Sequence, residues 1–120
     1  MTMTKNSLLT KKCTPCEGKT KALTKKEANV YLKNVPHWQM DAAGKVISRE
    51  FMMKNFVAAV GLINRVADIA ESENHHPDVH LVGYRKLTIC LNTHAIDGLS
   101  ENDFILAAKI NELPVELKNV

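Results

Sequence analysis

The chain lacks the sequence features that mark several large protein classes. None of its apolar runs approaches the ~20 residues that a membrane-spanning helix requires, and its lysine-bearing N-terminus has no apolar stretch typical of secretory signals. Its five glycines include no phosphate-binding loop and no dinucleotide fingerprint, and no serine lies in a nucleophile-elbow pattern. We therefore expect no membrane span and no secretory signal.

Cysteine is also scarce. The three cysteines do not form a disulfide framework, and Cys90 falls within a strand-like pattern, so we expect a reducing, cytoplasmic location. The other two form the motif Cys13-Thr14-Pro15-Cys16, which could be a redox pair, half of a zinc site or two free thiols. A structural zinc ion takes four ligands and no second such pair exists. We therefore favour two exposed thiols without a catalytic role.

The net charge of +3 hides an asymmetry. Residues 1–26 contain seven lysines and one acidic residue, whereas residues 27–120 contain nine basic and twelve acidic residues. Residues 1–22 also lack apolar periodicity, which predicts a flexible basic arm, followed by a single domain over 23–120. A mildly acidic domain argues against nucleic-acid binding.

The first part of the domain has a helix signal and a hairpin signal. Thr24 and Glu27 have the spacing of a capping box, which predicts a helix to about Lys33. Two alternating segments, 37–41 and 45–53, are separated by a short turn and predict an antiparallel hairpin.

The strongest helix signal spans residues 56–73. Asn55 is a favourable N-cap, and the apolar residues cover an arc of roughly 180°, wider than the ~100° that one contact needs. Either self-association through residues such as Leu62, Val66 and Ile69, or packing between the sheet and another helix, would bury this face.

Two further strand-like segments, 79–84 and 87–93, precede a last helix. Ser100 caps that helix, and Asp103 lies at the capping-box position. The element order α-β-β-α-β-β-α predicts an α+β fold, in which a four-stranded antiparallel sheet carries three helices on one face.

Four of the five histidines lie between residues 71 and 94. His75 and His76 must lie at or beyond a helix end, because Pro77 excludes the α-conformation for the residue before it. Glu71 lies one turn before His75, close enough to pair with it. His94 follows the last strand, and His80 is expected to be an exposed bystander.

Several chemistries could use these histidines. A zinc site is conceivable but has no settled carboxylate ligand. General acid–base catalysis fits better, because the unperturbed histidine pKa of roughly 6.5 lies near neutrality. From the pattern alone, a purely structural role at the helix end is equally compatible.

A resemblance decides between these alternatives. The pattern Glu71-x-x-x-His75-His76-Pro77, then Tyr84, Asn92-Thr93-His94 and the segment 98–103 closely resemble the pterin-4a-carbinolamine dehydratase family. The resemblance extends from about Leu23 to Leu113 and includes Trp38. The Cys-x-x-Cys-Glu arm also occurs in bacterial-type members.

The resemblance implies a lyase that dehydrates 4a-hydroxytetrahydropterin to quinonoid dihydropterin in tetrahydrobiopterin recycling, without a metal or cofactor. It implies that His75 and His94 are the acid–base groups, that His76 holds the pterin, and that Glu71 orients His75. Asn92 and Thr93 would offer hydrogen bonds. Asn74 stands where some relatives have aspartate, and Val79 replaces a common aromatic residue. We expect Asp103 to act mainly as a helix cap.

The resemblance also implies partners and alternatives. Family members are homodimers or homotetramers and act with a pterin-dependent aromatic amino acid hydroxylase. Some relatives double as dimerisation partners of transcription factors, so a non-catalytic binding protein is an alternative, and some relatives are thought to act in molybdenum-cofactor metabolism. Because the three motif histidines are present, the enzyme is the favoured interpretation.

Overall fold

Four α-helices and a four-stranded antiparallel sheet make up the described part of the chain. The computed structural model describes residues 5–14 and 21–119. The helices are α1 (Lys5–Thr10), α2 (Lys25–Leu32), α3 (Phe56–Glu73) and α4 (Glu101–Asn111), and a 3₁₀ helix, η1, spans His94–Ile96. The strands are β1 (Gln39–Met40), β2 (Ile47–Met52), β3 (Asp78–Val82) and β4 (Lys86–Leu91). They form one sheet in the order β1-β2-β4-β3, which confirms the predicted fold class.

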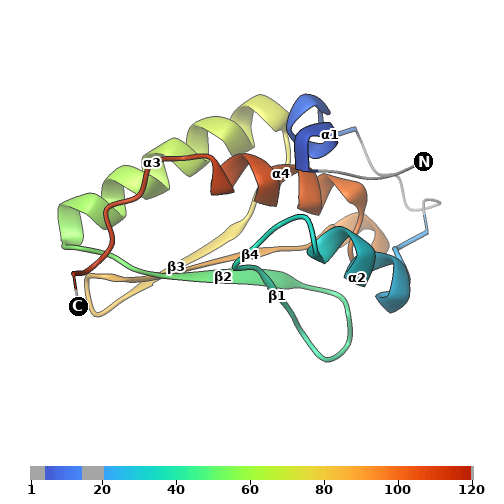
Figure 1. Cartoon of the computed structure of the whole chain (residues 1–120), viewed down its shortest axis with the longest axis horizontal. Helices are drawn as coiled ribbons and strands as arrows, with labels where there is room; N and C mark the ends of the chain where they lie inside the picture. Colours follow the sequence, from blue (N-terminus) through green and yellow to red (C-terminus); the bar gives the residue numbers. More distant parts are fainter. Residues whose placement is uncertain (1–4, 15–20, 120) are drawn as a thin grey trace.

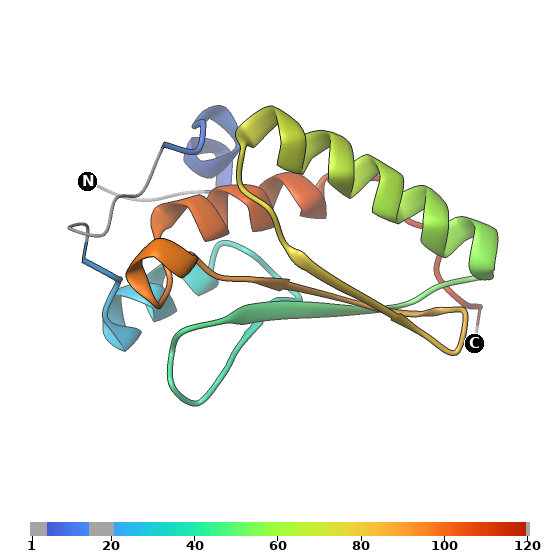
Figure 2. The ribbon, with the colours of Figure 1, turned by 180° about the vertical axis from the view of Figure 1, so that it is seen from behind.

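The helices are arranged around α4. Helices α3 and α4 cover one face of the sheet, and α2 packs against α4 near the end of the sheet (Figure 1). Helix α1 lies on the side of α4 that faces away from the sheet, as both views show (Figure 2). Within residues 5–14 and 21–119, no helix is long and apolar enough to span a membrane.

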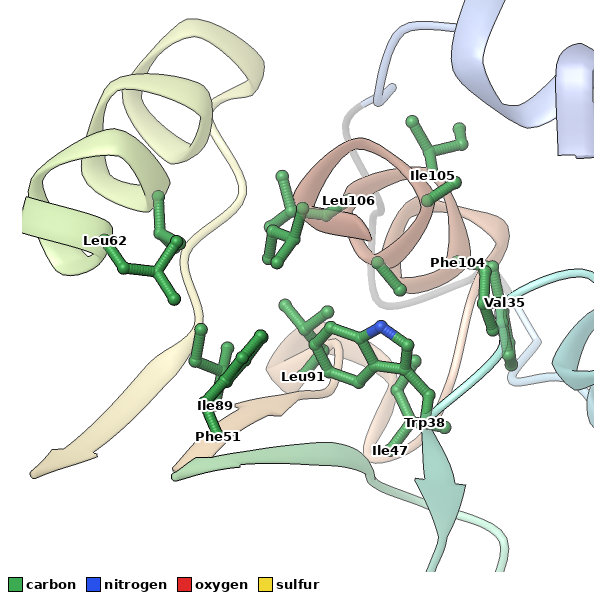
Figure 3. Packing of buried hydrophobic residues seen from close by; sticks show 14 of the residues in the cluster. Val35, Trp38, Ile47, Phe51, Leu62, Ile89, Leu91, Phe104, Ile105 and Leu106 are labelled. Carbon is green, nitrogen blue, oxygen red and sulfur yellow. The ribbon is translucent and has the colours of Figure 1, made fainter. Parts of the chain in front are cut away.

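The core follows from the alternation of the strands. Side chains on a strand point alternately to its two faces, and on β4 the inward positions Leu87, Ile89 and Leu91 are fully buried. The register pairs Leu91 with Ile47 and Leu87 with Phe51 on β2, so the apolar positions share a face. Figure 3 shows Ile47, Phe51, Ile89 and Leu91 facing α3 and α4. Fully burying each one contributes roughly 1.5–3 kcal/mol.

Helix α1 is the main difference from the predicted fold. Residues 5–10 were assigned to a flexible arm, but they form a helix whose Leu8 is fully buried in the core. The prediction failed because a six-residue helix is too short for a periodic pattern to stand out. Its contact with α4, which is distant in sequence, supplies the stability that its own sequence lacks.

Helix α1 also explains the burial of α4. Phe104, Ala107 and Ala108 face inward and are buried. Ile105 and Leu106 are buried as well. A helix with the sheet on one side and another helix on the opposite side is apolar over most of its circumference.

Helix α3 begins and ends as predicted. The Asn55 side chain accepts a hydrogen bond from the backbone N–H of Ala58, and the helix stops at Glu73. Of the two alternatives for its wide apolar face, packing between the sheet and another helix is the one observed, because Leu62 and Val66 are buried within this chain and Ile69 is partly buried against its core. The apolar arc is wide because α3 packs against the sheet and against α4.

Candidate active site

The C-terminal end of α3 sets the position of the first two histidines. Asn74 adopts the left-handed conformation (φ 51°), and its backbone N–H donates to the carbonyls of Ala70 and Glu71. Asparagine tolerates this conformation better than most residues, so it ends a helix well. The chain then leaves the helix axis, and His75 and His76 follow outside the helix, as Pro77 predicted.

His75 is held by a buried carboxylate from α4. Its Nε2 lies 2.6 Å from Oδ1 of Asp103, and the two side chains are 12% and 0% exposed. Asp103 Oδ2 accepts hydrogen bonds from Thr93 Oγ1 at 2.9 Å and from the backbone N–H of Ser100 at 3.0 Å. Asp103 is therefore both the predicted helix cap and a site residue, a role that the sequence analysis did not assign.

Glu71 pairs with a different histidine from the one predicted. Its carboxylate hydrogen-bonds to Nε2 of His76, not to His75. The expected spacing of four residues holds only on a continuous helix, and the left-handed turn at Asn74 breaks it. Both Glu71 and His76 are well exposed, so this pair contributes little stability.

His94 reaches the same region from the end of β4. A bridge between Thr93 and Gly98 closes a short loop, and His94 begins η1 inside it. The loop is further held by Thr93 Oγ1, which lies 2.8 Å from the hydroxyl of Ser100. His94 therefore lies beyond the end of β4, in the turn that forms η1.

One cavity gathers six of the seven predicted site residues. It has a volume of about 390 Å³ and lies where the end of α3, the end of β4 and the start of α4 meet. Its lining consists of Thr14, Asn74, His75, His76, Asn92, Thr93, His94, Ala95 and Asn102. Glu71 instead lines a neighbouring apolar groove between α3 and β3, together with His76.

Three lining residues, Thr14, Ala95 and Asn102, were not predicted. Thr14 belongs to the segment assigned to the arm, and Asn102 lies in a helix with no local sign of a site. A larger hollow of about 540 Å³ runs along β2 and contains His37 and Arg49, but none of the histidines between residues 71 and 94.

Cys13 is not the exposed thiol that the motif suggested. It is partly buried, and burial together with the nearby Glu73 carboxylate raises the pKa of its thiol to about 12. At neutral pH it is therefore protonated and a poor nucleophile. Cys16 lies outside the described residues. Across the described ranges, no group of three His, Cys, Asp or Glu side chains is arranged to hold a metal ion.

Imidazole groups exchange protons near neutral pH, so the arrangement of these histidines is suited to proton transfer. Since Asp103 accepts at both oxygens, the hydrogen on Nε2 of His75 points to it, and Nδ1 is the nitrogen left to exchange a proton. His76 and His94 supply two further imidazoles to the same polar cavity. The fold and site are thus those of an α+β protein with a histidine pocket.

Comparison with known proteins identifies the family. The sequence profile described as Pterin 4 alpha carbinolamine dehydratase matches residues 21–113, and the chain belongs to this family. A Halorhodospira halophila relative named after this dehydratase is 44% identical, over 89% of this chain and 97% of its own length. Pterin-4-alpha-carbinolamine dehydratase 2, mitochondrial, from Arabidopsis thaliana is 51% identical, over 91% of this chain and 60% of its own length. The prediction of a hydro-lyase is confirmed by this membership.

Solved structures agree with the fold. A Brucella melitensis protein described as a transcriptional coactivator/pterin dehydratase superposes with a TM-score of 0.70 at 33% identity. The match covers 75% of this chain and 95% of that structure. A pterin dehydratase-like protein identified as a RuBisCO assembly factor shares the fold, with a TM-score of 0.52, 16% identity, and coverage of 62% and 84%.

Proposed function

We propose that the protein dehydrates 4a-hydroxytetrahydropterin to quinonoid dihydropterin and water by histidine acid–base catalysis. The observation that carries the proposal is the cavity lined by His75, His76 and His94, in a chain of the dehydratase family. The reaction breaks the C4a–O bond, removes the proton from N5 and forms a C4a=N5 double bond. It needs an acid near the hydroxyl and a base near the nitrogen.

His75 and His94 are the proposed acid–base pair. Each such group contributes roughly 10²–10⁴-fold when it is positioned within hydrogen-bond reach. Asp103 supports His75 by holding its ring and its tautomer. His76 is paired with Glu71 and is more exposed, so we assign it to holding the pterin.

The predicted polar residues have different proposed roles. Asn74 and Asn92 line the cavity and would supply hydrogen bonds to the pterin. The Thr93 hydroxyl already contacts Asp103 and Ser100, and Thr93 is 5% exposed. We therefore assign Thr93 to positioning Asp103 and not to binding substrate. We assign Glu71 to holding the ring of His76, which its carboxylate contacts.

A direct assay tests the proposed activity. The dehydration of enzymatically generated 4a-hydroxytetrahydropterin is followed for wild type, His75→Ala and His94→Ala. We expect wild type to dehydrate the substrate faster than buffer alone, and each variant to lose most of this rate enhancement. A wild-type rate equal to buffer would refute the activity, whereas full activity in both variants would refute the assigned roles.

The physiological setting is part of the proposal. We infer that the protein recycles tetrahydrobiopterin beside a pterin-dependent aromatic amino acid hydroxylase in the cytoplasm; the Arabidopsis relative is named as mitochondrial. Co-purification with a hydroxylase, or stimulation of its turnover, tests the link. Loss of hydroxylase-supported growth on deletion of the gene would support recycling rather than a role in molybdenum-cofactor metabolism.

Self-association is also proposed, as a homodimer or homotetramer. Its support is the exposed apolar surface on the N-terminal half of α3, where Phe56 and Val57 are 54% and 78% exposed, and the unpaired edge of β3. Light scattering tests it, and a strict monomer at micromolar concentration would refute it.

A second candidate function is a non-catalytic coactivator or binding role. The description of the Brucella melitensis structure as a coactivator/pterin dehydratase favours it, and the exposed face of α3 could bind a helical partner. A folded wild type that binds a partner helix but neither binds pterin nor dehydrates it would favour this alternative.

A further inference from the structure

The cavity has a wall that comes from outside the matched family region. The family profile begins at residue 21, yet Thr14 lines the same cavity as the three histidines. Thr14 lies at the end of a described segment, residues 5–14, that begins with α1. Leu8 anchors this segment, since it is fully buried against the core.

Asn102 fixes the position of Thr14. Its Oδ1 accepts a hydrogen bond from the backbone N–H of Thr14 at 3.0 Å, and its Nδ2 donates to the backbone carbonyl of Thr14 at 2.6 Å. The amide thus pairs with both backbone groups of one residue, as a neighbouring strand would. Asn102 is only 5% exposed, so water competes little for these bonds.

A second anchor ties the segment to the end of α3. The backbone N–H of Cys13 donates to Oε1 of Glu73 at 2.8 Å, and Oε2 of Glu73 pairs with Nζ of Lys109 at 2.9 Å. Burial by itself would raise the pKa of Glu73, but the hydrogen bonds from Lys109 and Cys13 outweigh it and lower that pKa. The carboxylate therefore stays charged and keeps both partners at neutral pH.

The two anchors join the same elements that carry the catalytic groups. Glu73 is the last residue of α3, two positions before His75, and Asn102 precedes Asp103 on α4. The backbone of residues 13 and 14 is thus held against the two helix ends between which the His75–Asp103 contact forms. This placement is specific, because a segment that served only to cover α4 would need no contact with α3.

We propose that Thr14 is a substrate-contacting residue of the cavity and that Asn102 is the residue that positions it. The inference rests on the proposed function, since the ligand is the pterin substrate. A threonine carries a hydroxyl that donates and accepts, so this wall suits the hydrogen-bonding edge of a pterin and not an apolar group. It holds the ligand equally before and during reaction, and therefore acts on KM more than on kcat.

The test compares variants at Thr14 and Asn102 with a control in the same segment. Thr14→Val removes the hydroxyl at constant shape, Thr14→Ser retains it, and Asn102→Ala releases the backbone. Thr10→Val is the matched control, because Thr10 is exposed and its hydroxyl donates to the backbone carbonyl of Ser7 in the same helix. Each protein is assayed for kcat and KM, and for binding of 7,8-dihydrobiopterin, a stable reduced pterin, by calorimetry.

We expect Thr14→Val to raise KM and the dissociation constant roughly two- to tenfold, the range of one neutral hydrogen bond, with kcat nearly unchanged. Thr14→Ser should restore both values, and Thr10→Val should match wild type. Asn102→Ala should raise KM at least as much and should abolish hydrogen-exchange protection of the Thr14 amide. A purely structural role would instead lower the melting temperature without this split between KM and kcat.

The outcomes separate this inference from the proposed function. A wild type that neither dehydrates nor binds the pterin removes the proposed function, and this inference with it. A wild type that does both, with Thr14→Val and Asn102→Ala indistinguishable from Thr10→Val in KM and dissociation constant, overturns this inference alone. Thr14 is exposed, so Thr14→Val keeps the test decisive if Asn102→Ala fails to fold.

Discussion

The contact between His75 and Asp103 permits a sharp prediction for Asp103→Asn. The substitution keeps the shape of the side chain but replaces one carboxylate oxygen with an N–H₂ group. The remaining oxygen can still accept from Thr93 or Ser100, so the amide nitrogen turns toward His75 Nε2. Two donors cannot pair, and His75 must move its hydrogen to Nδ1, which leaves the wrong tautomer facing the cavity.

The size of the effect follows from the bond that is lost. A hydrogen bond to a charged group contributes roughly 1.5–3 kcal/mol, and both side chains are nearly or fully buried. If that energy is lost mainly in the transition state, kcat falls roughly 10- to 150-fold at 1.36 kcal/mol per factor of ten. Removing the negative charge near the N-terminus of α4 costs a further 0.3–1 kcal/mol or so in stability.

Steady-state kinetics and urea unfolding measure both effects. The matched control is Asp97→Asn, because Asp97 is 88% exposed and pairs with Lys45 at the surface; it should change neither kcat nor stability noticeably. The reasoning is refuted if Asp103→Asn is folded and its kcat stays within twofold of wild type. A KM effect without a kcat effect would also refute it, because it would make Asp103 a binding residue.

Three further predictions concern catalysis, acid stability and the N-terminal helix. His94→Ala should lower kcat by roughly 10²–10⁴-fold, whereas His80→Ala, at an exposed position of β3, should leave it unchanged. The pKa of Glu73 is lowered in the folded state. The charged Glu73 carboxylate therefore stabilises the folded protein above about pH 4.5, and this contribution is lost as the pH falls through the folded pKa. The urea midpoint should accordingly fall less between pH 5 and pH 3 in Glu73→Gln than in wild type. Leu8→Ala should cost roughly 2–5 kcal/mol of unfolding free energy, and Val30→Ala, at 53% exposure on α2, under about 0.5 kcal/mol.

A specific result would contradict each of these three predictions. Equal losses in His94→Ala and His80→Ala would mean that the assay reports general damage and not a catalytic role. Parallel pH profiles for Glu73→Gln and wild type would show that the ion pair of Glu73 contributes nothing to acid stability. A Leu8→Ala protein as stable as Val30→Ala would restore the flexible-arm interpretation of the N-terminus.

Local chemistry accounts for the parts of the fold that the sequence predicted. The capping box at Thr24, the N-cap at Asn55 and the capping box at Ser100 all form as expected. These signals work because the partners are three residues apart, and strand alternation works because adjacent side chains point to opposite faces. The strands, the three longer helices and the α+β class therefore followed from residues close together in the chain.

The contacts around the cavity join residues that are distant in sequence, so local patterns did not predict them. The sequence alone placed His75 and His76 beyond a helix end and His94 beyond a strand, and the family resemblance marked them as a site. The helical spacing paired Glu71 with His75, because nothing in the sequence indicated the left-handed turn at Asn74. Only the tertiary structure brings Asp103, 28 residues away, within 2.6 Å of His75.

The same limit applies to the N-terminal segment. Helix α1 has too few residues to stabilise itself, and its sequence carries no periodic signal. It forms because Leu8 enters a core built from distant elements, and because Asn102 and Glu73 hold residues 13 and 14 in place. Thr14 thus reaches the cavity through contacts about 60 and 88 residues distant in sequence, which no local pattern encodes. The sequence by itself determined the elements and the histidines; packing decided which groups those histidines meet.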